Sequence, residues 1–319
     1  MTLYDPFAVG PYSVTRSTDS IDLDTGLGRP HPVETWAPAE TPTRGPAGTE
    51  APTVLFSHRG GAHRGSASFL CAHLASHGYR VLATDHAETV DETLGGARPG
   101  EDAAGRAARA DLIARTRVVE LRTLLERAVA DGAERIGVVG HSIGGWTALT
   151  VAQADPRVDA VVAIAPAGGS DPRPGVYQVT LDPVRSVPTL YLTGAEDVST
   201  RLAGIRDMVS RTPDPVRLVV LDGADHYHFA DDVGAEHEAI RSAADTVPLL
   251  SWVRAMRQLD ELIDPAVAHA FAQGLTLAHL DATLRDRPAA AALLSGDLTA
   301  ALAARGIPAT EPERAPTRG

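Results

Sequence analysis

The stretch that decides the fold is Ile136-Gly-Val-Val-Gly-His-Ser-Ile-Gly-Gly-Trp146. Four strand-like residues run into the pattern G-x-S-x-G, and a helix-compatible run of small residues follows it. Such a turn forces its central residue, Ser142, into a strained backbone conformation. It needs glycine at 140 and 144, because a Cβ there would collide with a neighbouring strand or helix. The pattern predicts a serine raised clear of the sheet at a helix N-terminus, where the Ile143 N–H can meet a developing oxyanion.

Outward from this stretch, strand-like and helical segments alternate along most of the chain. Apolar or alternating runs predict eight strands, at residues 12–16, 31–36, 53–57, 79–84, 136–139, 158–164, 189–193 and 216–221. Continuous apolar runs such as 53–57 are typical of parallel strands buried on both faces, and the helical stretches between them imply right-handed βαβ units. The sequence therefore predicts an α/β fold: a doubly wound, mostly parallel, eight-stranded sheet with helices on both faces.

One domain over residues 1–305 accounts for this pattern, because the two N-terminal strands are too few to form a stable domain alone. Residues 239–262 read as an extra helical pair, a candidate lid or insertion within a C-terminal helical extension. The proline-rich tail, residues 306–319, is expected to be disordered.

Composition excludes several kinds of chemistry. The 319-residue chain contains no lysine, which removes Schiff-base chemistry, pyridoxal-phosphate attachment and a Walker-type phosphate loop. Its single cysteine, Cys71, excludes an internal disulfide and multi-cysteine metal sites. A net charge of −12 disfavours a nucleic-acid partner, and the arginines between residues 106 and 127 alternate with acids as on a solvated helix face. Without a membrane-spanning run or a signal peptide, a cytoplasmic enzyme with no membrane partner is expected.

Candidate partners for the serine follow two later strands, at the edge where open α/β sheets carry their chemistry. Asp197 follows the strand that ends at Thr193, and His226 follows the strand that ends at Leu221. In the chain order Ser142, Asp197, His226, the histidine would take the serine proton and later return it to the leaving group. The aspartate would hold the imidazole in the required tautomer.

The residues leave alternatives open at both positions. Asp171 follows the strand 158–164, and it competes with Asp197 for the role of the acid, as does Glu196. His228 competes with His226, which we favour because it comes directly after a strand and a tight turn.

The second oxyanion donor is expected in the glycine-rich turn that follows the strand 53–57. The Gly60 N–H is the first choice and the Arg59 N–H the second, because backbone amides there are not blocked by a side chain. The chain also has several histidines that invite comparison with a metal site, namely His58, His63, His86 and His226. His58 and His63 lie in this turn without a carboxylate at ligand spacing, so we predict no metal and no cofactor.

With these residues in place, the sequence resembles the α/β-hydrolase superfamily from about Val14 to Leu284. It looks most similar to a bacterial branch related to dienelactone hydrolases, platelet-activating-factor acetylhydrolases and cutinase-like polyester hydrolases. The matching motifs are Val54-Leu-Phe-Ser-His58, Leu74-Ala-Ser-His-Gly-Tyr79, Asp85-His86, Gly140-His-Ser-Ile-Gly-Gly145 and Gly223-Ala-Asp-His226. The resemblance implies the same fold and a serine hydrolase with a Ser-His-Asp triad.

Three features depart from that branch. Arg59 stands where the family usually has glycine, and its side chain would either face an acidic substrate or, as we favour, point outward into solvent. Ser142 replaces the cysteine nucleophile of dienelactone hydrolases proper, so dienelactone cleavage itself is not expected. A long segment, including residues 239–262, follows the histidine, where typical members end.

The predicted function is hydrolysis of carboxylic esters with short or medium acyl chains, as in serine esterases and lipase-like enzymes, through an acyl-enzyme intermediate. The expected partner is a small-molecule ester substrate. Two alternatives use the same fold: an acyltransferase or thioesterase in a biosynthetic pathway, and a non-catalytic binding protein.

Overall fold

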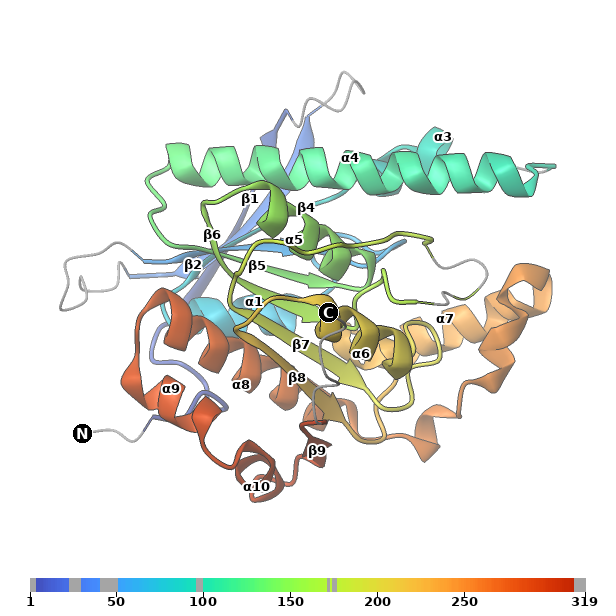
Figure 1. Ribbon diagram of the computed structural model, residues 1–319. Coiled ribbons are helices and arrows are strands. Elements are labelled where there is room, and N and C mark those ends of the chain that lie inside the picture. Colours follow the sequence, from blue (N-terminus) through green and yellow to red (C-terminus); the bar gives the residue numbers. More distant parts are fainter. Residues whose placement is uncertain are drawn as a thin grey trace.

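A computed structural model describes residues 4–22, 30–40, 51–95, 100–170, 173 and 177–312. Its centre is one sheet, whose strand order is β1-β2-β4-β3-β5-β6-β7-β8-β9 (Figure 1). The strands of the described residues are β1 (Val14–Ile21), β2 (His31–Pro38), β3 (Thr53–Ser57), β4 (Arg80–Thr84), β5 (Ile136–His141), β6 (Val158–Ile164), β7 (Thr189–Gly194), β8 (Val216–Leu221) and β9 (Ala309–Thr310). Strands β3 to β8 run parallel, and β1, β2 and β9 pair antiparallel at the two edges. The predicted α/β fold with a mostly parallel sheet is confirmed.

The ninth strand corrects two predictions at once. The sequence predicts eight strands and a disordered tail from residue 306. Instead, Ala309–Thr310 pairs with the end of β8, and the Asp222 N–H donates to the Pro308 carbonyl at 2.8 Å. Burial of Ile307, only 3% exposed, explains this order, because apolar contact with the core outweighs the proline content that suggested disorder. Residues 313–319 lie outside the described residues.

Helices cover both faces of the sheet, in layers that follow the alternation of side chains along each strand (Figure 1). The helices are α1 (Ser68–Ser76), α2 (Ala87–Val90), α3 (Glu92–Gly95), α4 (Ala103–Ala130), α5 (Ile143–Ala154), α6 (Leu202–Arg211), α7 (Val233–Thr246), α8 (Pro265–Leu284), α9 (Pro288–Ser295) and α10 (Leu298–Ala303). In β3, Val54 and Phe56 pack with α1 and α8 on one face. The residue between them, Leu55, packs with α4 and α5 on the other.

The described part of the segment after β8 forms three short 3₁₀ helices in addition to α7, α8, α9 and α10. These are η1 (His226–Phe229), η2 (Pro248–Ala255) and η3 (Leu259–Glu261). Residues 239–262, the candidate lid, lie in α7, η2 and η3. A small apolar cluster of Tyr227, Ala244, Val253 and Met256 joins α7 and η2 to η1. Residues 239–262 therefore pack directly beside the strand end that carries His226, and their action as a lid stays a prediction.

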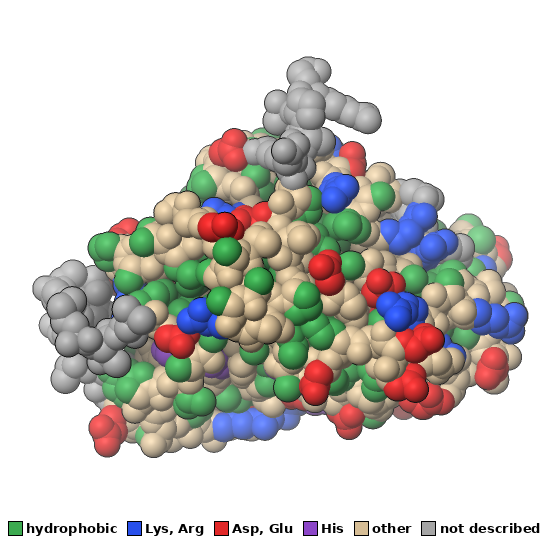
Figure 2. Space-filling view, turned by 90° about the horizontal axis from the view of Figure 1, so that it is seen from below, with side chains coloured by type: hydrophobic (Ala, Val, Ile, Leu, Met, Phe, Trp, Pro, Cys, Tyr) green, Lys and Arg blue, Asp and Glu red, His purple; other side chains and the backbone are tan. Residues whose placement is uncertain are grey.

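On the face shown in Figure 2, the described residues form no large region of a single charge. There, acidic and basic side chains of the described residues are interspersed with apolar ones. Among the same residues, no helix combines the length and apolarity needed to cross a membrane.

Candidate active site

Ser142 occupies the strained position that the sequence predicts. It lies between β5 and α5 with φ 60° and ψ −123°, a conformation that residues with a side chain rarely adopt. A Cβ on Gly140 would lie 2.1 Å from the Gly144 carbonyl oxygen, and a Cβ on Gly144 would lie 2.1 Å from the Ser57 carbonyl oxygen. Only glycine fits at either place, because the helix and β3 approach the turn so closely. The glycine requirement of the pattern is thus explained by two backbone contacts.

Two amides at this edge are free to receive an anion. Ile143 begins α5, so its N–H has no acceptor within that helix. Gly60 follows β3 in the segment 58–61, which we call the oxyanion turn. Within the part of the chain that the structure describes, neither the Ile143 nor the Gly60 N–H makes a hydrogen bond. Both are therefore able to donate to a ligand.

Asp197 and His226 come together at the ends of β7 and β8. The His226 Nδ1–H donates to Asp197 Oδ2 at 2.8 Å. Asp197 is 4% exposed, and its other oxygen accepts the N–H groups of Ser199 at 2.7 Å and Thr200 at 2.9 Å. Burial tends to raise the pKa of Asp197, but the His226 ring and the hydrogen bonds outweigh it and hold the pKa below its usual value. Asp197 is therefore an ionised, rigidly held partner for the imidazole.

A second histidine, His141, ties this pair to the serine. The His141 Nε2–H donates to the His226 carbonyl at 3.0 Å, and the two rings lie 4.8 Å apart. Burial holds the pKa of His141 well below its usual value, so this ring is neutral and donates through one fixed nitrogen. Because His141 directly precedes Ser142, the contact fixes the His226 loop against the turn at residues 140–144, which we call the elbow. His141 belongs to the G-x-S-x-G motif, but the motif itself does not indicate this role.

The competing residues lie in other surroundings. Glu196 is partly exposed and faces Arg257 at 3.7 Å. His228 is buried, with Nδ1 2.7 Å from Asp225 Oδ1 and Nε2 3.0 Å from the Ile263 carbonyl. Asp171, the alternative acid, lies outside the described residues. The structure therefore pairs Asp197 with His226, whereas His228 is paired with Asp225.

Arg59 does not have the solvated position that we favoured. Its side chain is 14% exposed and pairs with Glu236 of α7, while Nη1 donates to the Gly60 carbonyl at 2.8 Å. Its guanidinium also lies over the Tyr227 ring, 5.5 Å from the centroid. The prediction that Arg59 points outward is wrong, because Glu236 and the Tyr227 ring, both from the segment after β8, hold its guanidinium. Arg59 thereby links the oxyanion turn to α7.

A buried polar cluster lies beneath the oxyanion turn. It consists of Ser57, His58, His86, Glu88, Arg117 and Glu120. His86 joins Ser57 Oγ at 2.8 Å to Glu120 Oε2 at 2.5 Å. Burial raises the pKa of Glu120 to about 7 and lowers the pKa of His86 well below its usual value, so burial favours the neutral form of each.

Two parts of this cluster bear on the sequence predictions. Arg117 is fully buried, which corrects the view of all arginines between residues 106 and 127 as one solvated helix face. His63, unlike His58 and His86, is not part of the cluster. Among the described residues, no three His, Cys, Asp or Glu side chains are grouped so that they could hold a metal ion.

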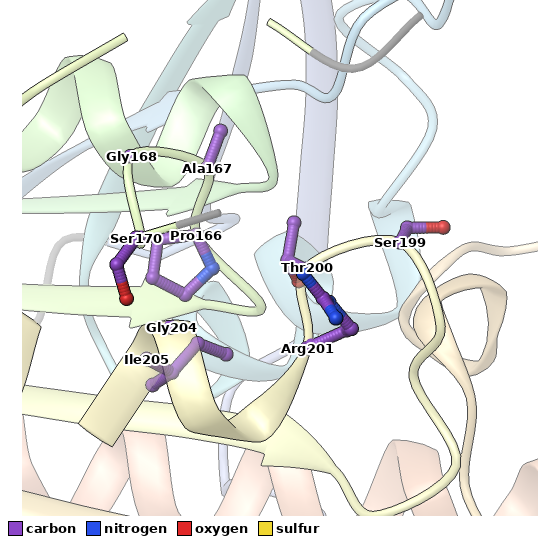
Figure 3. Close-up of a pocket in the computed structure, with 10 residues that line it drawn as sticks. Pro166, Ala167, Gly168, Ser170, Ser199, Thr200, Arg201, Gly204 and Ile205 are labelled. Atoms are coloured by element: carbon purple, nitrogen blue, oxygen red, sulfur yellow. The ribbon is translucent and has the colours of Figure 1, made fainter. Parts of the chain in front are cut away.

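A small cavity lies near the loop that follows β7 and carries Asp197 (Figure 3). It lies between the segment after β6, Pro166–Ser170, and the residues from Ser199 to Ile205 that lead into α6. Its volume of about 20 Å³ is enough for one water molecule and too small for an acyl group. This cavity is therefore not the place where an ester would bind.

Comparison with known proteins bears on the part of this site that comes before Asp197 in the chain. A family model described as serine aminopeptidase, S33, matches residues 48–183. The match includes β3, the oxyanion turn and the elbow, and it ends before Asp197 and His226. No curated protein sequence matches the chain. The fold and this match identify an α/β-hydrolase fold and support a hydrolase, and the narrower resemblance to the dienelactone hydrolase branch stays a prediction.

Proposed function

We propose that this protein is a serine hydrolase that cleaves carboxylic esters through Ser142, His226 and Asp197. The observation that carries the proposal is the buried Asp197–His226 pair, which His141 fastens to the elbow that bears Ser142. A strained serine, an oriented imidazole and two free amides are the parts that acyl transfer needs. A protein that only binds a ligand has no need of a strained elbow.

The chemistry follows from proton transfer. His226 Nε2 takes the proton from Ser142 Oγ as Oγ attacks the ester carbonyl carbon, and the oxyanion accepts hydrogen bonds from the Ile143 and Gly60 amides. The tetrahedral intermediate collapses, and His226 returns the proton to the departing alcohol. Water then attacks the acyl-enzyme with His226 again as the base. The bond between the acyl carbon and Ser142 Oγ breaks, His226 returns the proton to Oγ, and the carboxylic acid leaves. Asp197 keeps Nδ1 protonated and stabilises the imidazolium in both steps.

The matching family model is named for an aminopeptidase, so a peptide is the competing substrate. An aminopeptidase must bind a free α-ammonium group, which calls for an unpaired carboxylate near the scissile bond. Glu236, an acid beside the oxyanion turn, is already neutralised by Arg59. This pairing removes Glu236 as a partner for a free N-terminus, and for that reason we propose an ester substrate.

A fluorophosphonate probe and a series of p-nitrophenyl esters of increasing chain length test the proposal. The probe should label Ser142, and Ser142→Ala should lower kcat by on the order of 10⁴-fold or more while the thermal midpoint stays nearly constant. Ser20→Ala, at an exposed position on β1, serves as the matched control. Near-normal ester hydrolysis by Ser142→Ala would refute the mechanism.

Three further assays separate the remaining alternatives. Faster turnover of aminoacyl p-nitroanilides than of any ester would assign a peptidase. Acyl transfer to an added alcohol or amine in preference to water would assign a transferase, and preference for thioesters over matched oxygen esters would assign a thioesterase.

A further inference from the structure

Arg117 is a fully buried arginine on α4, and its guanidinium lies beneath the oxyanion turn. Its Nη1 donates to the His58 carbonyl at 2.7 Å and its Nη2 to the Arg59 carbonyl at 3.3 Å. The third partner is Glu88, which accepts from Arg117 Nε at 2.8 Å and neutralises the charge. Burial of a guanidinium costs free energy unless its N–H groups are hydrogen-bonded. Here two of the acceptors are backbone carbonyls of one turn.

The Arg59 carbonyl is held by two further donors. The His58 Nδ1–H donates to it at 2.7 Å, and the Ala62 N–H donates at 3.2 Å. The tautomer of His58 follows from its surroundings, because its Nε2 accepts the His86 N–H at 3.1 Å and the proton must therefore sit on Nδ1. Burial holds the pKa of His58 well below its usual value, so the ring stays neutral.

These contacts determine the direction of the Gly60 amide. In a trans peptide the carbonyl and the following N–H point in opposite directions. The Arg59 carbonyl points down toward Arg117, so the Gly60 N–H points away from α4. The turn itself contains Gly60 and Gly61, which restrict the backbone little, so the side chains beneath it supply the rigidity.

We propose that Arg117, together with His58, forms a clamp that positions the second oxyanion donor of this hydrolase by holding the Arg59 carbonyl. The proposal rests on the proposed function, and Arg117 is a positioning residue, because it touches the turn and not the substrate. Donors that are aimed before the reaction stabilise the developing charge without reorganisation. Without the clamp, the Gly60 N–H remains but its direction is no longer fixed.

The test removes the guanidinium without leaving a buried carboxylate unpaired. The double variant Arg117→Met, Glu88→Gln keeps the volume and the neutrality of the cluster. Arg115→Met is the matched control, since Arg115 lies on the same helix but is 68% exposed and pairs with Asp111. Arg117→Lys retains the charge beside Glu88 but cannot reach both carbonyls in a fork.

The expected result is specific to the transition state. The double variant should lose about 10- to 100-fold in kcat with KM changed less than about 3-fold, because misaiming a donor costs somewhat less than removing it. Inhibition by a trifluoromethyl ketone, whose serine adduct carries an oxyanion, should weaken by a similar factor. Binding of the neutral alcohol product should change little, because it carries no oxyanion, and Arg117→Lys should recover part of the loss.

Three outcomes would overturn the clamp: wild-type kcat and inhibition in the folded double variant, a rise in KM alone, or an equal loss in Arg115→Met. If the double variant does not fold, Arg117→Lys gives the same comparison, and wild-type kcat and inhibition in it would likewise refute the clamp. Failure of the underlying function looks different, because wild-type protein would then hydrolyse no ester and Ser142 would resist the fluorophosphonate.

Discussion

Replacement of Asp197 by asparagine tests the site most sharply, because the structure dictates how the new side chain must lie. Asp197 Oδ1 accepts two backbone N–H groups, from Ser199 and Thr200, so only the amide oxygen of asparagine can occupy that place. The NH₂ group must then face His226 Nδ1, where the carboxylate oxygen now lies 2.8 Å away. His226 Nδ1 becomes an acceptor, and the ring proton moves to Nε2.

The magnitude follows from this change of tautomer. Nε2 carries a proton and cannot accept another from Ser142, so the base is lost while the side-chain volume is kept. We expect kcat to fall by about 10³- to 10⁴-fold, which corresponds to roughly 4–5.5 kcal/mol of transition-state stabilisation. The free energy of unfolding should fall by only about 1–2 kcal/mol, the worth of a charge-assisted hydrogen bond that becomes neutral.

The assay compares kcat for a short p-nitrophenyl ester in the wild type, Asp197→Asn, Asp197→Ala and Asp171→Ala, with urea denaturation of each. Asp197→Asn and Asp197→Ala should both be severely impaired, and Asp171→Ala should stay within a few-fold of the wild type. Severe loss of kcat in Asp171→Ala, together with near-normal kcat in Asp197→Asn, would refute the assignment of Asp197. The catalytic acid would then lie after β6.

Three further changes have defined outcomes. Glu236→Gln removes the partner of Arg59 across a partly exposed contact, so the free energy of unfolding in urea should drop by about 1 kcal/mol. Gly144→Ala places a Cβ 2.1 Å from the Ser57 carbonyl oxygen, so the backbone must shift; we expect about 3 kcal/mol or more of lost stability, read from the thermal midpoint, together with loss of esterase activity. His279 has its pKa lowered to about 4 by burial, so the unfolded chain binds its proton more tightly and stability is lost as pH falls from about 6.5 through about 4. His279→Gln should therefore lose about 2 kcal/mol less than the wild type between pH 7 and pH 5 in urea denaturation, and an equal loss in both proteins would contradict this assignment.

The sequence by itself determined the parts that depend on neighbouring residues. The elbow is a property of five consecutive residues, because Gly140, Ser142 and Gly144 define a turn that few other sequences permit. The parallel strands are equally local, since each is a short apolar run between helical stretches. The chain order of Ser142, Asp197 and His226 follows from these strands, because parallel strands end at the same edge of the sheet.

Only the tertiary structure decided the features that join distant segments. Helical periodicity could not tell which arginine of α4 is buried, because Arg117 is chosen by Glu88 and by two carbonyls of the oxyanion turn. The direction of Arg59 depends on Glu236, 177 positions later in the chain. The two residues of β9 carry no periodic pattern, and they pair only because β8 offers a free edge. In each case the stabilising contact joins residues that are far apart in the chain. No window of consecutive residues therefore contains both partners.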